Sequence, residues 1–114
     1  MKDETIVQSS PVGKRLKKLG KKNVQCLLFN GKEIQMHSRL TIGRAKENDF
    51  VIDDSMVSRF HLEVQQIRGS YFIKDRGSSN GTYLNDRLIS PDKYIKLKNG
   101  DVIRLGNRIE LTLV

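Results

Sequence analysis

The sequence predicts an all-β protein, an antiparallel β-sandwich preceded by an N-terminal tail. Three observations support this prediction. Short apolar, β-branched runs begin after Lys22, turn residues separate these runs at close intervals, and no later segment keeps the 3.6-residue period of a helix. With 114 residues the chain has room for one modest core. We therefore divide it into a flexible tail, residues 1–23, and one domain, residues 24–114.

Ten segments of the domain are predicted to be strands. The first two, residues 24–29 and 32–37, are joined by Asn30-Gly31, the strongest two-residue signal for a hairpin. The other strands are expected in order at 39–42, 50–52, 61–67, 71–75, 82–84, 94–97, 102–105 and 109–114. Turn residues separate several of them, at Arg68-Gly69, Asn85-Asp86, Asn99-Gly100 and Gly106-Asn107.

Three connections are longer and more polar than the rest, at residues 45–49, 53–59 and 75–81. Loops held by a rigid sandwich lie on the surface, where binding residues are most often found. We therefore expect the functional residues of this protein in or beside these loops.

The tail carries most of the positive charge. Its first 22 residues contain seven Lys or Arg and two acidic residues, which gives +5 of the total +8 and leaves +3 for the remainder. Ser9, Ser10, Pro11 and Gly13 interrupt any periodicity, so the segment is predicted to be flexible. A solvated basic linker is favoured over a nucleic-acid or membrane contact.

Several classes of protein are disfavoured by composition. No apolar run approaches the roughly 18 residues of a membrane span, and the N-terminus lacks the apolar stretch of a signal peptide, so a cytoplasmic location is expected. Cys26 is the only cysteine, which allows no internal disulfide. With His37 and His61 as the only histidines, no ordinary zinc cluster can be assembled, and we predict no metal and no cofactor.

Three motifs at loop edges carry groups that suit a phosphate. Arg44, in Gly43-Arg44, offers a planar fork of N–H donors, and Arg59 adds a second positive charge. Ser58 and Ser79 offer hydroxyl donors. Asn80 has a donor and an acceptor on one amide, which suits a peptide backbone better than an anion alone.

The order and spacing of these motifs resemble the signature of the forkhead-associated (FHA) domain family. That signature is GR, then SxxH, then a hydroxyl residue with NG, followed by a short strand and an asparagine. The corresponding residues here are Gly43-Arg44, Ser58 with His61, Ser79-Asn80-Gly81 and the stretch Thr82-Tyr83-Leu84-Asn85. The stretch NGDVIRLG at residues 99–106 is also similar to the family. The resemblance covers residues 24–114 and implies an eleven-stranded sandwich that binds phosphothreonine peptides without hydrolysing them.

The resemblance also implies a role for each motif residue. Arg44 and Ser58 would hold the phosphate, while Arg59 and Ser79 would complete the phosphate shell and the pocket for the threonine methyl group. Asn80 would fix the peptide main chain beside the phosphothreonine. Three further residues would support the site structurally, namely Gly43, His61 and Gly81.

One position departs from the family pattern and one specificity element stays open. Ser79 stands where many members have threonine, which keeps the hydroxyl and puts only the tightness of the methyl pocket in doubt. Two segments are candidates for selecting the third residue after the phosphothreonine, Gly106-Asn107 and the region near Asp86-Arg87.

An enzyme and a nucleic-acid binder are the competing classes. Residues three apart on a strand point to opposite faces, so Ser58 and His61 are not expected to form a nucleophile and base. Asp53 and Asp54 are adjacent and diverge, so they are expected to be loop residues. Binding of nucleic acid or an acidic surface by the basic tail remains the alternative function, disfavoured because the tail contains no aromatic residue.

Thr5 is a candidate phosphorylation site, because it follows Asp3-Glu4 and precedes β-branched residues in the predicted flexible tail. The implied partners are phosphothreonine proteins and a Ser/Thr protein kinase. Some small bacterial FHA proteins carry such a threonine, and the resemblance implies that the phosphorylated tail would occupy the domain's own site. A monomer is the default state.

Overall fold

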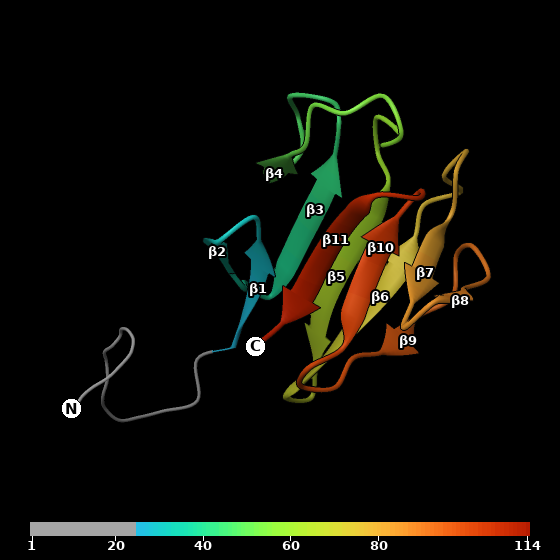
Figure 1. The fold of residues 1–114 in the computed structure, drawn as a ribbon. Coiled ribbons are helices and arrows are strands. Elements are labelled where there is room, and N and C mark those ends of the chain that lie inside the picture. Colours follow the sequence, from blue (N-terminus) through green and yellow to red (C-terminus); the bar gives the residue numbers. More distant parts are fainter. Residues whose placement is uncertain (1–24) are drawn as a thin grey trace.

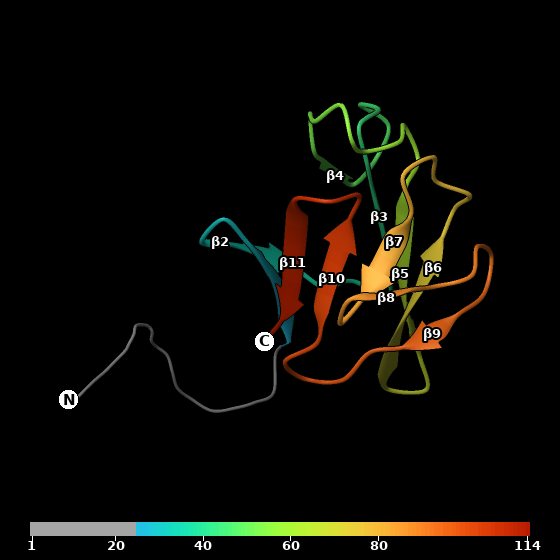
Figure 2. The ribbon, with the colours of Figure 1, turned by 45° about the vertical axis from the view of Figure 1, so that its right-hand side comes forward.

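The computed structural model describes residues 25–114, which form two β-sheets packed face to face (Figures 1 and 2). One sheet has the strand order β2-β1-β11-β10-β7-β8 and the other the order β4-β3-β5-β6-β9. The six-stranded sheet contains β1 (Cys26–Phe29), β2 (Lys32–Gln35), β7 (Thr82–Leu84), β8 (Arg87–Leu88), β10 (Val102–Leu105) and β11 (Ile109–Leu113). The five-stranded sheet contains β3 (Arg39–Gly43), β4 (Phe50–Val51), β5 (Leu62–Ile67), β6 (Ser70–Asp75) and β9 (Ile95–Lys96). The predicted tail and Val24 lie outside the described residues.

The predicted β-sandwich is confirmed, with eleven strands in the described part of the chain. All ten strands expected from the sequence are present, and their ends differ from the expected ones by at most two residues. Asn30 and Gly31 both have positive φ, 50° and 76°, as a two-residue hairpin turn of this kind requires.

β8 is the strand that the sequence pattern missed. Its two residues, Arg87 and Leu88, are both exposed, so they lack the apolar alternation by which a strand is recognised. Asn85 and Asp86, predicted as a turn, both have positive φ and form the tight connection that pairs β8 with β7.

One pairing departs from the expected antiparallel arrangement. β4 runs parallel to β3, because the loop at residues 44–49 brings the chain back to the level of Ile42 before β4 begins. Asp49 stabilises this return, since its carboxylate accepts hydrogen bonds from the backbone N–H and the hydroxyl of Thr41.

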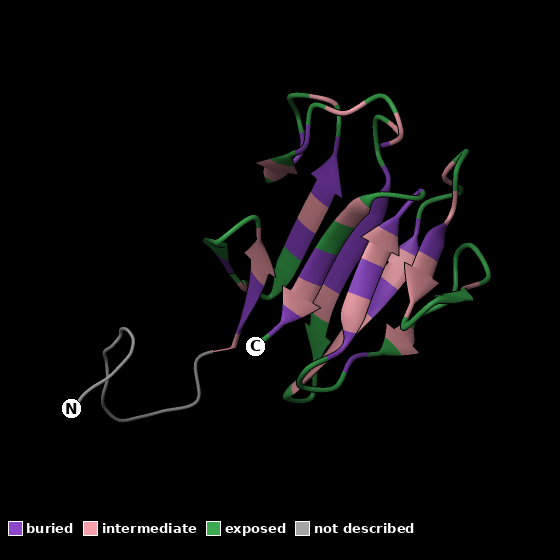
Figure 3. Cartoon of the chain, in the orientation of Figure 1, coloured by how far each residue is buried: buried purple, intermediate pink, exposed green. Residues whose placement is uncertain are grey.

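The core lies between the sheets, and strands of both sheets contribute buried residues (Figure 3); in β10, buried Ile103 and Leu105 alternate with half-buried Val102 and Arg104. Apolar side chains buried on the inner faces exclude water, which supplies the main driving force for folding. The core residues come from both sheets and from the loops beside them: Leu27, Ile34, Leu40, Ile42, Ile52, Val57, Leu62, Val64, Ile73, Leu97, Ile103, Leu105, Leu111 and Leu113.

The strand register brings the three predicted motifs to one end of the sandwich. Leu62, at the start of β5, pairs with Ile42 near the end of β3 and with Asp75 at the end of β6. Thr82, at the start of β7, pairs with Leu105 at the end of β10. The loops that follow β3, precede β5 and join β6 to β7 are therefore neighbours at the top of Figure 1.

The opposite end of the sandwich holds the entry and exit of the described chain. Cys26 and Val114 exchange two backbone hydrogen bonds, of 3.3 Å and 3.0 Å. Burial raises the pKa of the Cys26 thiol, with a smaller contribution from the Glu33 carboxylate. None of the described residues belongs to a helix long and apolar enough to cross a membrane.

Candidate functional site

The first two site loops are joined by their backbones. The Arg44 N–H donates to the Ser58 carbonyl at 3.0 Å, and the Ala45 N–H donates to the Arg59 carbonyl at 3.1 Å. The exposed Arg44 side chain is anchored by its Nε, which donates to the Val57 carbonyl at 3.0 Å. This contact fixes one edge of the guanidinium, while its two Nη groups have no hydrogen-bond partner among residues 25–114.

Gly43 is required by close packing, as expected for a supporting residue. A Cβ built at this position would lie 2.2 Å from the Arg59 carbonyl oxygen and 2.8 Å from Nδ2 of Asn48. These distances are below any that real Cβ atoms show, so any other residue would push the two loops apart.

Asn48 contributes to the site although the sequence did not single it out. Its buried side-chain amide donates to the carbonyls of Ala45 and Arg59, at 2.9 Å and 2.7 Å. The amide therefore fixes the loop after β3 to the segment that carries Ser58 and Arg59. The sequence shows only an asparagine in a polar loop, and a single sequence does not reveal that this residue is buried.

Ser58 connects the second loop to the third. Its hydroxyl oxygen accepts a hydrogen bond from the Ser79 N–H at 3.0 Å. The hydroxyl hydrogen remains available to donate, which is the property that a phosphate oxygen needs. Ser58 and Ser79 are thus held together, as the predicted site requires.

His61 supports both loops from below. It is fully buried, its Nδ1 accepts from the Ser58 N–H at 3.0 Å, and its Nε2 lies 3.0 Å from the Gly81 carbonyl. Because Nδ1 is an acceptor, the ring is neutral and Nε2 carries the hydrogen. Burial lowers the pKa of His61, although the Gly81 carbonyl and the Asp75 carboxylate oppose this.

The same contacts correct the reason given for excluding a Ser58-His61 nucleophile pair. Residues 58–60 are not in a strand, and the two residues do touch. The contact, however, uses the Ser58 backbone N–H, while the Ser58 hydroxyl is hydrogen-bonded to Ser79. Both ring nitrogens are occupied by backbone groups, so His61 is not placed to accept a proton from that hydroxyl.

Asp75 organises the third loop and was also missed. This carboxylate is 3% exposed and accepts from the N–H groups of Gly77 and Ser78 and from the hydroxyls of Ser78 and Thr82. Burial alone would raise its pKa, but these hydrogen bonds outweigh burial and leave the pKa lowered. An aspartate two residues before a glycine is a turn signal that the sequence did offer.

Asn80, Ser79 and Arg59 lie at the exposed rim of the site. The Asn80 Nδ2 donates to the Met56 carbonyl at 3.1 Å, which orients the amide and leaves its oxygen free to accept. Gly81 has φ of +85°, a conformation that favours glycine, and accepts hydrogen bonds from both His61 and the Gly106 N–H.

The two candidate specificity segments fall in different places. Gly106 packs against Met56 and donates to the Gly81 carbonyl, so it borders the site. Asp86 lies beyond the other end of β7 and forms an ion pair with Arg104. Among residues 25–114 there is no cluster of three or more His, Cys, Asp or Glu that could hold a metal ion.

The fold and the site together define the family. A family model described as FHA domain matches residues 40–106, more than half of the chain. The chain therefore belongs to the FHA domain family. The FHA domain is a phosphothreonine-binding module, and its fold is not a catalytic one.

Two solved structures have the same fold. A solution structure of an FHA domain from Arabidopsis thaliana is 30% identical, with a TM-score of 0.73, and the match covers 84% of this chain and 92% of that one. The MEK1 FHA domain in complex with a phosphothreonine peptide of HOP1 is 30% identical, with a TM-score of 0.70, and the match covers 78% and 93%.

The curated relatives are longer proteins. The oxoglutarate dehydrogenase inhibitor of Corynebacterium diphtheriae is 41% identical over 66 residues, which are 58% of this chain and 44% of that protein. The chain spans less than half the length of the first curated relatives that it matches.

Proposed function

We propose that this chain is a phosphothreonine-dependent protein-binding module that acts in Ser/Thr kinase signalling. The observation that carries the proposal is the convergence of Arg44, Ser58 and Ser79 at one end of the sandwich. Their loops are joined by hydrogen bonds of 3.0 Å, so the donors are held in place before a ligand arrives. Arg59 and Asn80 stand at the rim of the same site.

A phosphate is the ligand that suits these donors. A phosphoryl group carries a charge of about −1.5 to −2 and three strong acceptor oxygens. In the proposed complex the Arg44 guanidinium binds two of these oxygens, and the Ser58 hydroxyl donates to the third. Each charge-assisted hydrogen bond contributes about 1.5–3 kcal/mol, so a few of them dominate the affinity of a short peptide.

The comparisons support a binding function. One neighbour was solved with a phosphothreonine peptide, and one relative is named as an inhibitor of oxoglutarate dehydrogenase. The target of that relative is not transferred to this chain, because the match covers less than half of the relative.

A titration followed by ¹⁵N NMR tests the proposal. Three degenerate peptide pools are compared, with phosphothreonine, phosphoserine or unmodified threonine at the fixed position. We expect amide shifts at Arg44, Ser58, Ser79 and Asn80 with the phosphothreonine pool alone. Equal shifts with all pools contradict the proposal. So does the lack of any response when both the full chain and a chain without residues 1–22 are tested.

Replacement of Arg44 tests the phosphate contact directly. We expect Arg44→Ala to abolish detectable phosphopeptide binding while the fold is kept, because the serine hydroxyls cannot replace a bidentate guanidinium. Arg68→Ala is the matched control, since it removes the same charge from the exposed turn between β5 and β6. Wild-type affinity in Arg44→Ala, or an equal loss in Arg68→Ala, contradicts the assignment. Circular dichroism checks that both variants fold.

We further propose that phosphorylation of Thr5 makes the protein its own ligand. Thr5 lies outside the described residues, and the proposal rests on its Asp-Glu-Thr context. The 19 peptide steps from Thr5 to Val24 extend up to about 60 Å, far more than the radius of gyration of about 13 Å expected for this domain size. A tethered ligand has an effective concentration of about 1 mM, so a peptide of micromolar affinity would be mostly bound.

Phosphorylated protein tests this intramolecular contact. With Thr5 phosphorylated, we expect shifts at Arg44 and Ser58 that do not depend on protein concentration, and loss of binding to external phosphopeptides. The control is the Thr5→Ala variant, treated with the Ser/Thr kinase that is used to phosphorylate the wild-type chain. Unchanged shifts near Arg44, or shifts that appear only with concentration-dependent dimerisation, are incompatible with self-inhibition.

A further inference from the structure

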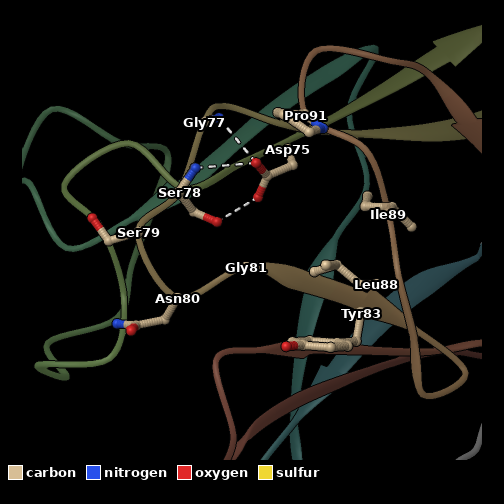
Figure 4. Close-up of a pocket in the computed structure, with 10 residues that line it drawn as sticks. All are labelled: Asp75, Gly77, Ser78, Ser79, Asn80, Gly81, Tyr83, Leu88, Ile89 and Pro91. Atoms are coloured by element: carbon tan, nitrogen blue, oxygen red, sulfur yellow. Dashed lines mark hydrogen bonds between the residues drawn. The ribbon is translucent and has the colours of Figure 1, made fainter.

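A hollow lies beside the loop that carries Ser79 and Asn80, on the side away from these two side chains (Figure 4). It has a volume of about 430 Å³ and is bordered by residues 77–81, by Asp75, by one residue each of β7 and β8, and by the chain segment between β8 and β9 (Figure 4). Ser79 and Asn80 line it with their backbone, while their side chains point away from it (Figure 4). The loop is therefore a wall shared by the phosphate site and this hollow.

The hollow is polar on one wall and apolar on the other. On the polar wall, Asp75 already accepts four hydrogen bonds from its own loop and from Thr82, so its oxygens are occupied. The apolar wall is formed by Tyr83, Leu88, Ile89 and Pro91. A ligand that enters this hollow meets satisfied polar groups and open apolar surface, which favours an apolar group over a charged one.

Leu88 is the feature that most needs an explanation. Among the described residues it is the most exposed of the large hydrophobic side chains, at 64%. It lies over Gly81, where an added Cβ would come within 2.9 Å of its Cδ1. Covering an exposed leucine with an apolar group of a ligand removes its surface from water, which contributes favourably to the free energy of binding.

The walls are formed before any ligand binds. The Ile89 N–H donates to the Thr82 carbonyl at 3.0 Å, and the Asp92 N–H donates to the Asp75 carbonyl at 2.8 Å. These bonds fasten the segment between β8 and β9 to β7 and β6. On the remaining side, Tyr83 is held by the Arg104 guanidinium, which lies 4.3 Å from its ring centre. Pre-formed walls reduce the entropy lost on binding.

We propose that this hollow is a specificity subsite for a large apolar side chain, such as leucine, methionine or phenylalanine, of the phosphorylated peptide. The inference rests on the proposed phosphothreonine binding. The hollow adjoins the proposed phosphate site, because the loop 77–81 borders both and Asn80 is proposed to hold the peptide main chain. An extended peptide advances about 3.3 Å per residue, so the apolar residue lies within about three positions of the phosphothreonine. The subsite is separate from Met56 and Gly106, which border the phosphate site.

A positional scan tests the subsite on the full, unphosphorylated chain. The probes are peptides with phosphothreonine among alanines, in which one flanking alanine at a time is replaced by leucine or by aspartate. At one position we expect leucine to bind at least about tenfold more tightly than alanine, the usual effect of filling an apolar pocket. We expect Leu88→Ser to remove most of this preference while the affinity for the all-alanine peptide stays the same.

Two further variants keep the result interpretable. Ile67→Ser removes another exposed hydrophobic side chain, at the far end of β5, and is expected to keep the leucine preference. Leu88→Lys is expected to shift the preference at that same position from leucine to aspartate.

Three results overturn the inference. If leucine has no effect at any position, or if its effect survives in Leu88→Ser, the subsite is wrong although phosphothreonine binding stands. If no phosphorylated peptide binds the wild-type chain, the proposed function fails and the subsite fails with it.

Discussion

At the scale of single residues, His61 shows how a buried side chain sets the shape of an exposed site. One ring nitrogen accepts from the Ser58 backbone and the other faces the Gly81 carbonyl, so the ring joins the second loop to the third. A protonated ring would have no acceptor at Nδ1 and would confront the Ser58 N–H. The neutral ring is therefore a condition for the site geometry.

This condition predicts a pH dependence of stability. The pKa of His61 is lower in the folded chain than its ordinary value of about 6.5, mainly because of burial. As the pH falls below about 6.5, the unfolded chain takes up a proton that the folded chain does not, so the free energy of unfolding decreases. The stabilisation that comes from neutral His61 is fully present above about pH 6.5. Below that pH the free energy of unfolding decreases by at most about 1.4 kcal/mol per pH unit.

Urea denaturation between about pH 5.5 and pH 7.5 measures how the free energy of unfolding changes with pH. This pH interval lies above the range in which carboxylates ordinarily titrate. We expect His61→Gln to lose most of the slope and His37→Gln to keep it, because His37 is the other histidine and is exposed. A slope that persists in His61→Gln, or disappears in His37→Gln, assigns the effect to another group.

The exposed residues of the candidate site were identified from the sequence, whereas two of its buried polar supports were not. Arg44, Ser58, Ser79 and Asn80 carry distinctive donor groups at recognisable spacings. Asn48 and Asp75 act through hydrogen bonds made inside the fold, and a single sequence does not show which polar residues become buried.

At the scale of secondary structure, the junction of β3 with the loop before β5 requires a residue without a side chain, which is Gly43. Gly43 lies at the end of β3, where the backbone of Arg59 crosses it within the reach of a Cβ. Its φ is not in the left-handed region, so the requirement at this position comes from space and not from backbone conformation.

A pair of glycine variants separates these two requirements. We expect Gly43→Ala to lower the free energy of unfolding by about 3 kcal/mol or more and to weaken phosphopeptide binding, because the added carbon displaces the Arg59 carbonyl. Gly31→Ala should cost only about 1–2 kcal/mol, since its φ of 76° is strained for alanine but no atom lies within 4 Å. Denaturant unfolding compares them, and equal losses in the two variants contradict the packing argument.

Strand prediction succeeded where strands alternate and are bounded by turns, as with Asn30-Gly31 between β1 and β2. It failed for β8, whose existence follows from the type of turn at Asn85-Asp86 and from pairing with β7, not from its own two residues. The parallel pairing of β4 was missed because the relative direction of two paired strands depends on the path of the loop between them, which the sequence pattern of the strands does not show.

At the scale of the whole molecule, charge and core are separated along the chain. The first 22 residues hold +5 of the +8 formal charge, whereas all buried apolar residues of the described part lie between Cys26 and Leu113. We therefore propose residues 24–114 as the folding unit and the basic segment as a regulatory addition.

Removal of residues 1–22 tests this division. The free energy of unfolding of the shortened chain should lie within about 0.5 kcal/mol of that of the full chain, because every buried apolar residue of the described part is kept. It should also bind the same phosphothreonine peptides. A larger loss of stability, measured by urea denaturation, means that the segment packs on the domain. Loss of phosphopeptide binding, measured by fluorescence polarisation, means that the segment contributes to the site.

The backbone pairing of Cys26 with Val114 has a consequence for how this domain can be used in longer proteins. The chain enters and leaves at adjacent points on the end opposite the binding loops. A domain with this geometry can be inserted into a host loop without stretching the host or covering its own ligand site. The same geometry favours circular permutation, in which a short linker joins the two ends and new termini open in an exposed turn such as Arg68-Gly69.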